Sequence, residues 1–158
     1  MLHSLRFSGF AALALVLAVS CTKSPSGKVY TSTNPMTFQQ VVPQPTPVSN
    51  GSGTVEASYD QNTRLLSYTV RWQATDSATA IHVHGLGEAG FAAPIIQNVA
   101  SGVPRRTSGS FSNTLLIDGI VLKEDELLSG RYYIDLHTKA YANAAAGGEL
   151  RGQLEFNR

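Results

Sequence analysis

The chain has 158 residues, with 12 Lys and Arg against 11 Asp and Glu, 4 His and a single Cys. This length is typical of one domain with short extensions and is enough to bury a hydrophobic core. A net charge of +1 gives no basic surface for nucleic acid, so no DNA or RNA partner is expected. One cysteine excludes an intramolecular disulfide and a zinc site made of cysteine ligands.

Residues 1–20 are predicted to be an export signal and not part of the fold. Arg6 is their only formal charge, and an apolar run from Phe7 to Val19 follows it. A run of about 13 residues is too short for a helix that crosses a bilayer, which needs roughly 20. The sequence therefore predicts a signal peptide and an exported protein.

Cys21 follows this segment in the sequence Ala18-Val19-Ser20-Cys21. These residues resemble the lipobox of bacterial lipoproteins, in which the cysteine becomes the lipidated first residue. Ala18 departs from the leucine that is commonest at its position, whereas Ser20 fits. Lipidation of Cys21 would place the protein on a membrane of the cell envelope, at the outer membrane or facing the periplasm in a Gram-negative host. The alternative is an ordinary secretory signal followed by an incidental cysteine.

Residues 21–34 are predicted to be the lipidated cysteine and a flexible tether. The stretch from Thr22 to Asn34 is rich in Ser and Thr and has no acidic residue. Such a stretch buries too little apolar surface to offset the loss of chain entropy. The folded domain is therefore expected over residues 35–158. Loss of the signal would remove Arg6 and His3, which leaves a mature chain without net charge.

Apolar and polar residues alternate with a period of two from Met36 onward, which is typical of strands with one buried face. The clearest example is Leu66 to Trp72. Further strands are predicted at Met36–Phe38, Val55–Tyr59, Thr79–His84, Ile95–Val99, Gly109–Ile117, Tyr132–His137 and Leu150–Phe156. Residues 122–129 are the one predicted helix, because acidic residues stand in its first turn and Gly130 can end it. About seven or eight short strands predict an all-β antiparallel sandwich or flattened barrel.

The segment Gly85 to Gly90 has the spacing G-x-G-x-x-G directly after a predicted strand. A dinucleotide site also needs a helix that begins at this loop and an acidic residue about 20 positions later. Pro94 follows closely instead, and the later stretch carries Arg105 and Arg106. No nucleotide partner is expected. Neither a G-x-S-x-G motif nor a phosphate-binding loop occurs, so no enzymatic activity is expected.

Three histidines of the predicted mature chain are candidates for a metal site. His82 and His84 alternate along one strand, so both project to the same face of the sheet, opposite the apolar residues. His137 and Asp135 share a face of another strand in the same way. Imidazole is a good ligand for copper or zinc, so the four side chains could hold one such ion. If the apolar residues face the core, all three imidazoles face outward.

A second interpretation needs no metal. The same histidines could donate hydrogen bonds to Asp135 or Glu149, or lie beside Arg151, and so connect the strands on the outer face of the sheet. The sequence does not show whether the strands of His82 and His137 are neighbours. Both interpretations therefore stay open at this point.

Three segments, in this order, resemble the CHRD (chordin-type) domain family. They read AIHVHG at 80–85, LSGRYYIDLHT at 128–138 and GELRGQL at 148–154. The family shows an H-x-H strand, a helix ending in L-x-x-G, a strand ending in His-Thr, and a closing G-E-[IL]-R-G-Q. The resemblance extends from about Asn34 to Asn157. Residues 142–147 depart from the short Pro-Gly turn that is more usual there.

The resemblance implies an exported immunoglobulin-like or related β-sandwich. Several motif residues are expected to be structural: Gly85, Gly130, Thr138, Glu149, Arg151, Gly152 and Gln153. Animal chordin, which carries repeated CHRD domains, antagonises bone morphogenetic proteins, but that activity is not expected of a lone bacterial copy. The HVHG strand also resembles copper/zinc superoxide dismutase, which needs more histidines than this chain has, and a disulfide as well.

Two functions are therefore expected of this sequence. The first is a lipid-tethered, non-enzymatic binding or structural module that requires no cofactor, with an unidentified protein or envelope ligand as its partner. The second is a copper- or zinc-binding protein of the cell envelope that uses His82, His84 and His137, with Asp135 nearby.

Overall fold

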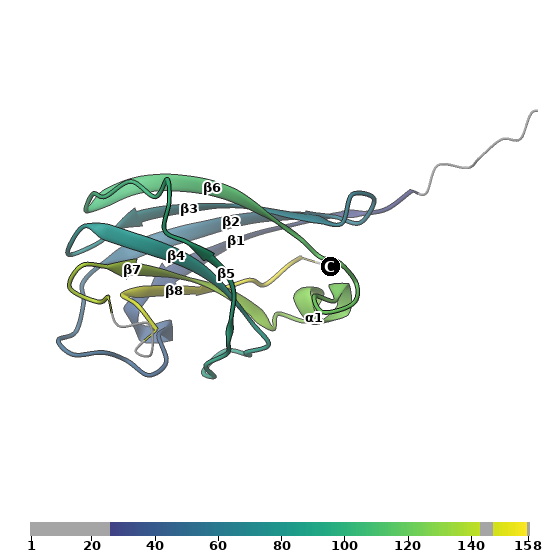
Figure 1. Cartoon of the computed structure of the whole chain (residues 1–158). Coiled ribbons are helices and arrows are strands. Elements are labelled where there is room, and N and C mark those ends of the chain that lie inside the picture. The colour runs from purple at the N-terminus through teal and green to yellow at the C-terminus, as the bar shows by residue number, and fades with distance from the viewer. Residues whose placement is uncertain (1–25, 143–146, 158) are drawn as a thin grey trace, which may run out of the picture.

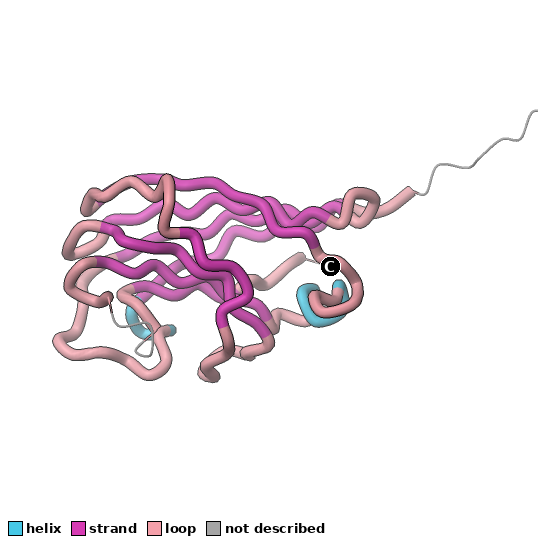
Figure 2. Tube along the Cα trace, in the orientation of Figure 1, coloured by secondary structure: helices cyan, strands magenta, loops and turns pink. Residues whose placement is uncertain are grey.

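The computed structural model describes residues 26–142 and 147–157. The predicted signal peptide and Cys21 lie outside these residues. The described chain forms one sheet of eight antiparallel strands in the order β5-β4-β7-β8-β1-β2-β3-β6 (Figure 1). The strands are β1 Val29–Thr37, β2 Ser52–Asp60, β3 Leu65–Gln73, β4 Ala78–Gly85, β5 Ile95–Val99, β6 Ser108–Leu116, β7 Tyr132–Thr138 and β8 Leu150–Gln153. A 3₁₀ turn, Phe38–Gln40, and one helix, α1 Glu124–Leu128, complete the fold (Figure 2).

The two edge strands of this sheet, β5 and β6, are connected by side chains. Tyr68 Oη on β3 donates a hydrogen bond to Gln97 Oε1 on β5 at 2.7 Å. Gln97 Nε2 donates to the backbone oxygen of Thr114 on β6 at 2.8 Å. The sheet is therefore curved into a nearly closed, flattened barrel. The predicted all-β class with one short helix is confirmed.

Strands β1, β2, β3 and β6 form the half of the barrel in which buried and exposed positions alternate. On β3, Leu66, Tyr68 and Val70 point into the core, as the sequence predicts. The outward positions are mostly Ser and Thr, and they align across the strands. One such row is Thr31, Ser58, Ser67 and Thr114. We call this outer surface the hydroxyl face.

Strands β4, β7 and β8 form a half that is covered on both sides. Ile81 and Val83 on β4 and Ile134 on β7 contribute to the apolar core. The opposite side of the same strands carries polar side chains, yet every residue of β7 and β8 is buried. Loops must therefore cover the outer side of this half, and the candidate site lies beneath them.

The structure corrects the predicted start of the domain. Residues 29–34 belong to β1 and pair with β2 from Val29 opposite Asp60 onward, so they are not a tether. A stretch of Ser and Thr can form a strand when a neighbouring strand satisfies its backbone, which composition alone does not reveal. The helix also begins later than predicted, at Glu124, and Gly130 follows it with a positive φ of 77°. Among the described residues no helix is long and apolar enough to cross a membrane.

Candidate metal centre

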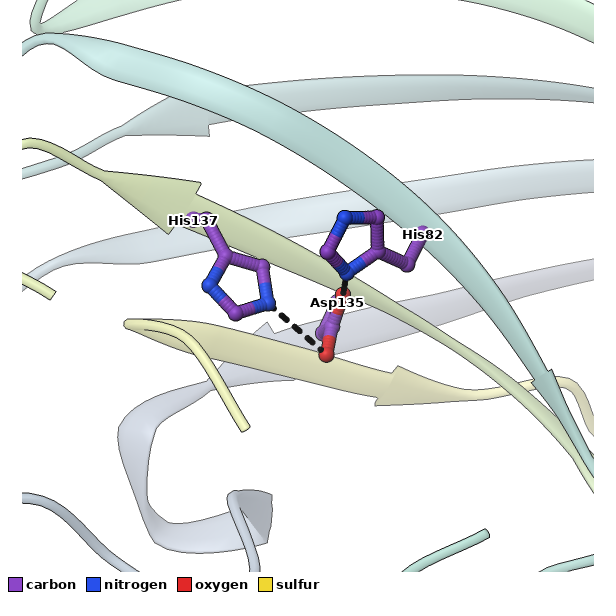
Figure 3. Close-up of side chains that lie close together, drawn as sticks. All are labelled: His82, Asp135 and His137. Atoms are coloured by element: carbon purple, nitrogen blue, oxygen red, sulfur yellow. Dashed lines mark ion pairs between the residues drawn. The ribbon is translucent and has the colours of Figure 1, made fainter. Parts of the chain in front are cut away.

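The predicted site residues of β4 and β7 meet on the outer side of the covered half. β4 and β7 are neighbours in the sheet, with His82 opposite Asp135 and Ala80 opposite His137. Because alternate residues share a face, both strands direct their polar side chains to one place. Figure 3 shows His82 and His137 turned toward Asp135, which lies between them. The structure thus shows that the strands of His82 and His137 are adjacent.

Asp135 is in contact with all three imidazoles. Its Oδ1 lies 3.4 Å from Nδ1 of His82. Its Oδ2 lies 2.9 Å from Nε2 of His84 and 3.3 Å from Nε2 of His137. One ligand atom each from His82, Asp135 and His137 lies within 4.8 Å of the other two. His84 approaches Asp135 but is not in that group of three; its ring stacks on Tyr133, with ring centroids 4.6 Å apart.

The facing atoms of this cluster lack hydrogen-bond partners. They are Nδ1 of His82, Nε2 of His84, Nε2 of His137 and both carboxylate oxygens of Asp135, all of them buried. The contacts are close, but they do not have hydrogen-bond geometry. Leaving a buried polar atom unsatisfied costs about 1–3 kcal/mol, so five such atoms at one place call for a common partner. Imidazole nitrogens and a carboxylate are ligands that zinc and copper accept.

The far sides of two imidazoles are fixed by backbone carbonyls. His84 Nδ1 donates to the backbone oxygen of Ala93 at 2.8 Å, and His137 Nδ1 donates to that of Tyr141 at 3.2 Å. A carbonyl only accepts, so these Nδ1 atoms carry the proton; a neutral His137 ring then presents the lone pair of Nε2 to the cluster, whereas His84 with a second proton on Nε2 faces the Asp135 carboxylate. Carbonyls that orient histidines in this way are common in metal sites.

Burial and mutual contact set the protonation of the cluster. Burial lowers the pKa of His82 below its ordinary value and outweighs the attraction of Asp135. Burial also disfavours charge on His84, but the contact with Asp135 outweighs it and raises the pKa of His84. For Asp135 burial opposes ionisation, yet His137 and His84 prevail and the pKa is lowered. Near neutral pH an ionised Asp135 and a neutral His82 are in the forms that bind metal.

The prediction that the imidazoles face outward is corrected in one respect. They lie on the outer side of the sheet, but His82 and His84 are each only 5% exposed and His137 is 2% exposed. The segments that contain Ala93 and Tyr141 cover them. A period-two pattern shows which side chains share a face and carries no information on what covers that face.

Two residues of the C-terminal GELRGQL segment, Arg151 and Gln153, hold a segment that covers the site in place. The Arg151 guanidinium lies 3.5 Å over the Tyr133 ring and donates to the backbone oxygens of Phe91 and Glu88. Gln153 Nε2 donates to the backbone oxygens of Gly87 and Gly130. In the second interpretation from sequence, the histidines pair with Asp135, Glu149 or Arg151; in the structure the imidazoles contact Asp135, whereas Glu149 and Arg151 have other partners.

Glu149 connects a second set of loops. Its Oε1 accepts hydrogen bonds from Ser49 Oγ and from both N and Oγ1 of Thr75, and its Oε2 accepts one from Thr138 Oγ1.

Two of the motif glycines lie where a side chain would collide with a neighbour. A Cβ at Gly152 would lie 2.7 Å from Met36, and one at Gly85 would lie 2.6 Å from Ile96.

The role of the 86–94 segment was not found from the sequence, where its glycines indicated only a turn. The sequence did contain one indication of this role, in the strand that carries Arg151 and Gln153. Two long polar side chains on one face need partners above that face, and this segment supplies them.

A family model described as the CHRD domain matches residues 32–154, which is most of the chain. The chain belongs to the CHRD domain family. No curated protein and no solved structure matches the chain significantly. The match includes β4, β7 and β8, so the four residues of the candidate metal centre lie within the CHRD domain.

Proposed function

We propose that this CHRD domain binds one transition-metal ion, zinc or copper, through His82, Asp135 and His137. The observation that carries the proposal is a set of four buried atoms of these residues that lack a hydrogen-bond partner and lie at one place: Nδ1 of His82, Nε2 of His137 and both carboxylate oxygens of Asp135. His84 is proposed to position Asp135 through its contact with Oδ2. In the competing, purely structural interpretation, such well-buried groups should satisfy one another by hydrogen bonds.

The proposed role is binding and not catalysis. The ligand side chains are almost fully buried, so a substrate would not reach the ion without displacement of the covering loops. Zinc sites that serve structure are closed in this way, whereas catalytic ones keep a position open to substrate. The bound ion would join β4 to β7 and stabilise the domain.

Metal titration of the mature chain tests this proposal. We expect isothermal titration calorimetry with Zn(II) or Cu(II) on a Cys21→Ser chain to show one site. Asp135→Asn keeps the shape of the side chain and removes its charge, so affinity should fall at least about tenfold, or roughly 1.4 kcal/mol. Asp125→Asn, at an exposed position of α1, is the matched control and should bind as the parent chain does.

Thermal unfolding gives a second measurement. A ligand that binds only the folded state at about 100 times its Kd adds roughly 2.7 kcal/mol of stability, so the melting temperature should rise with metal in the parent chain alone. Parent binding weaker than about 10 μM, near −7 kcal/mol, would contradict the proposal. Equal affinities of Asp135→Asn and Asp125→Asn would contradict it as well.

We also propose that the protein is exported and anchored in the cell envelope by acyl chains on Cys21. The apolar segment before this residue and the lipobox-like Ala18-Val19-Ser20 support the proposal. Intact-mass spectrometry of the membrane-bound protein should show an N-terminal residue, Cys21, that carries acyl chains. A soluble chain that begins at another residue would refute it.

A further inference from the structure

Exposed apolar side chains gather at one end of the barrel. Ile120 is 80% and Val121 is 76% exposed, in the loop between β6 and α1. Val29, Leu65 and Leu116 are also exposed, at the ends of β1, β3 and β6. We call these five residues the apolar end. Exposure of apolar side chains to water is unfavourable, so a group of five at one end of the barrel needs an explanation.

The strand register places these residues together. Leu65 is opposite Leu116, and Asp60 stands between Leu65 and Val29 in the same row across the sheet. The neighbouring rows of this surface form the hydroxyl face. Exposed Val and Leu therefore replace Ser and Thr only in the last row of this outer surface, which contains Val29, Leu65 and Leu116. Apolar residues scattered at random over the surface would not be confined to one row.

The loop that carries Ile120 and Val121 has a defined conformation. Asp118 Oδ1 accepts hydrogen bonds from the backbone N–H groups of Ile120 and Val121 at 2.8 and 2.9 Å. Arg64, in the turn between β2 and β3, donates from Nη1 to the Asp118 backbone oxygen at 3.1 Å. These bonds hold the loop against the end of the barrel, with both apolar side chains directed away from the core.

The N-terminal chain enters the fold at this same end. In Figure 1 the chain leaves β1 beside the turn between β2 and β3 and beside the loop that leads into α1. Cys21 stands eight residues before Val29. Eight residues span at most about 28 Å, so a lipid on Cys21 would keep this end close to the bilayer. The opposite end of the barrel would point away from it.

We propose that the apolar end lies on the membrane surface, with Ile120 and Val121 inserted at the boundary of the headgroups and acyl chains. This proposal rests on the proposed lipidation of Cys21. The charges beside this loop balance, so attraction to anionic lipid does not drive the contact; they are the acidic Glu124, Asp125 and Glu126 of α1 and the basic Lys28, Arg64 and Lys123. The contact is therefore expected with uncharged phosphatidylcholine and should persist at high salt.

A fluorescent label on the loop tests the contact in the lipidated full-length protein. Val121→Cys is labelled with an environment-sensitive nitrobenzoxadiazole dye and reconstituted into phosphatidylcholine vesicles. Acylation blocks the Cys21 sulfur, so only the new thiol reacts. Ser101→Cys, exposed in the turn after β5 at the other end of the barrel, is the matched control. Cys21→Ser/Val121→Cys supplies the spectrum of the same site in water.

We expect a blue-shifted emission at position 121 and strong quenching by nitroxide-labelled lipid, with neither effect at position 101. Mass spectrometry of the same sample reports whether Cys21 is acylated. An acylated, vesicle-bound protein whose label at 121 keeps its spectrum in water would overturn the membrane contact and leave the anchor standing. An unacylated, soluble protein would overturn both. A blue shift of the Cys21→Ser chain that grows with protein concentration would assign the apolar end to a second copy and overturn the proposal.

Discussion

Asp135 and Glu149 are two carboxylates with no measurable exposure, and their surroundings differ in kind. Four hydrogen-bond donors reach the oxygens of Glu149. Neither oxygen of Asp135 has a hydrogen-bond partner, although three imidazoles face it. Both residues belong to segments that resemble the CHRD motifs, and the sequence analysis expects Asp135 near a metal and Glu149 in a structural role. The number of donors separates a structural carboxylate from a candidate ligand.

Replacement of Glu149 by Gln is predicted to destabilise the domain. One carboxylate oxygen would become an NH₂ group that faces the donors of Thr75 and Ser49 or of Thr138, so buried donors would lose their acceptor. Each such loss costs about 1–3 kcal/mol, and the free energy of unfolding in urea should fall by at least that amount. Glu155→Gln, exposed in the same segment, should change it by less than about 0.5 kcal/mol. Equal stabilities of the two variants would refute the structural role of Glu149.

The helix α1 is too short to be stable alone and depends on its contacts with the sheet. Tyr59 on β2 donates its hydroxyl to Glu124 Oε2 at 2.9 Å, and Gln61 contacts the other oxygen of the same carboxylate. Leu127 is buried in the core. The first turn of the helix is thus fixed to the end of β2, beside the apolar end.

This contact predicts a loss of stability at alkaline pH. Burial, followed by the hydrogen bond to Glu124, raises the pKa of Tyr59 from 10.0 to about 12. The unfolded chain loses this proton near pH 10 and the folded one near pH 12, so the stabilisation is complete below pH 10 and declines as the pH rises to 12. Urea unfolding at pH 9, 10 and 11 should show a shallower decline for Tyr59→Phe than for the parent chain. Identical slopes would contradict the assignment.

Prediction of the elements from the sequence succeeded where one face of a strand meets water. β3 alternates apolar and polar residues because its outer side is solvated and its inner side forms the core. β1 was missed over residues 29–34, because Thr31 and Thr33 occupy the hydroxyl face and a buried position is taken by the polar Ser32, which leaves few apolar positions. β7 and β8 were found as strands, but the burial of their outer side was not.

Closure of the barrel is a property of the whole molecule and depends on few groups. Gln97 links β5 to Tyr68 on β3 and to Thr114 on β6, which are far apart in the chain. Exposed sheet edges invite pairing with other chains, so these bonds also protect the edges.

Gln97→Ala is predicted to weaken the connection of β5 to β3 and β6. Tyr68 is almost fully buried and would lose the acceptor of its hydroxyl, at a cost of about 1–3 kcal/mol. Hydrogen exchange of the β5 and β6 amides should become faster, while the central strands β1 and β8 should change less. Ser108→Ala, exposed at the start of β6, should leave exchange as in the parent chain. Uniform acceleration over all strands would instead indicate global destabilisation.

The sequence by itself determined the all-β class, the short helix, the CHRD family and the common face of His82 and His84, because these follow from local periodicity and from motifs. Tertiary structure alone decided that β4 and β7 are neighbours, that loops cover their outer side, and that apolar residues from three strands and a loop lie at the end where the chain enters. Each of these depends on pairing between segments distant in the chain, and a period-two pattern fixes the face of a side chain without fixing its neighbours.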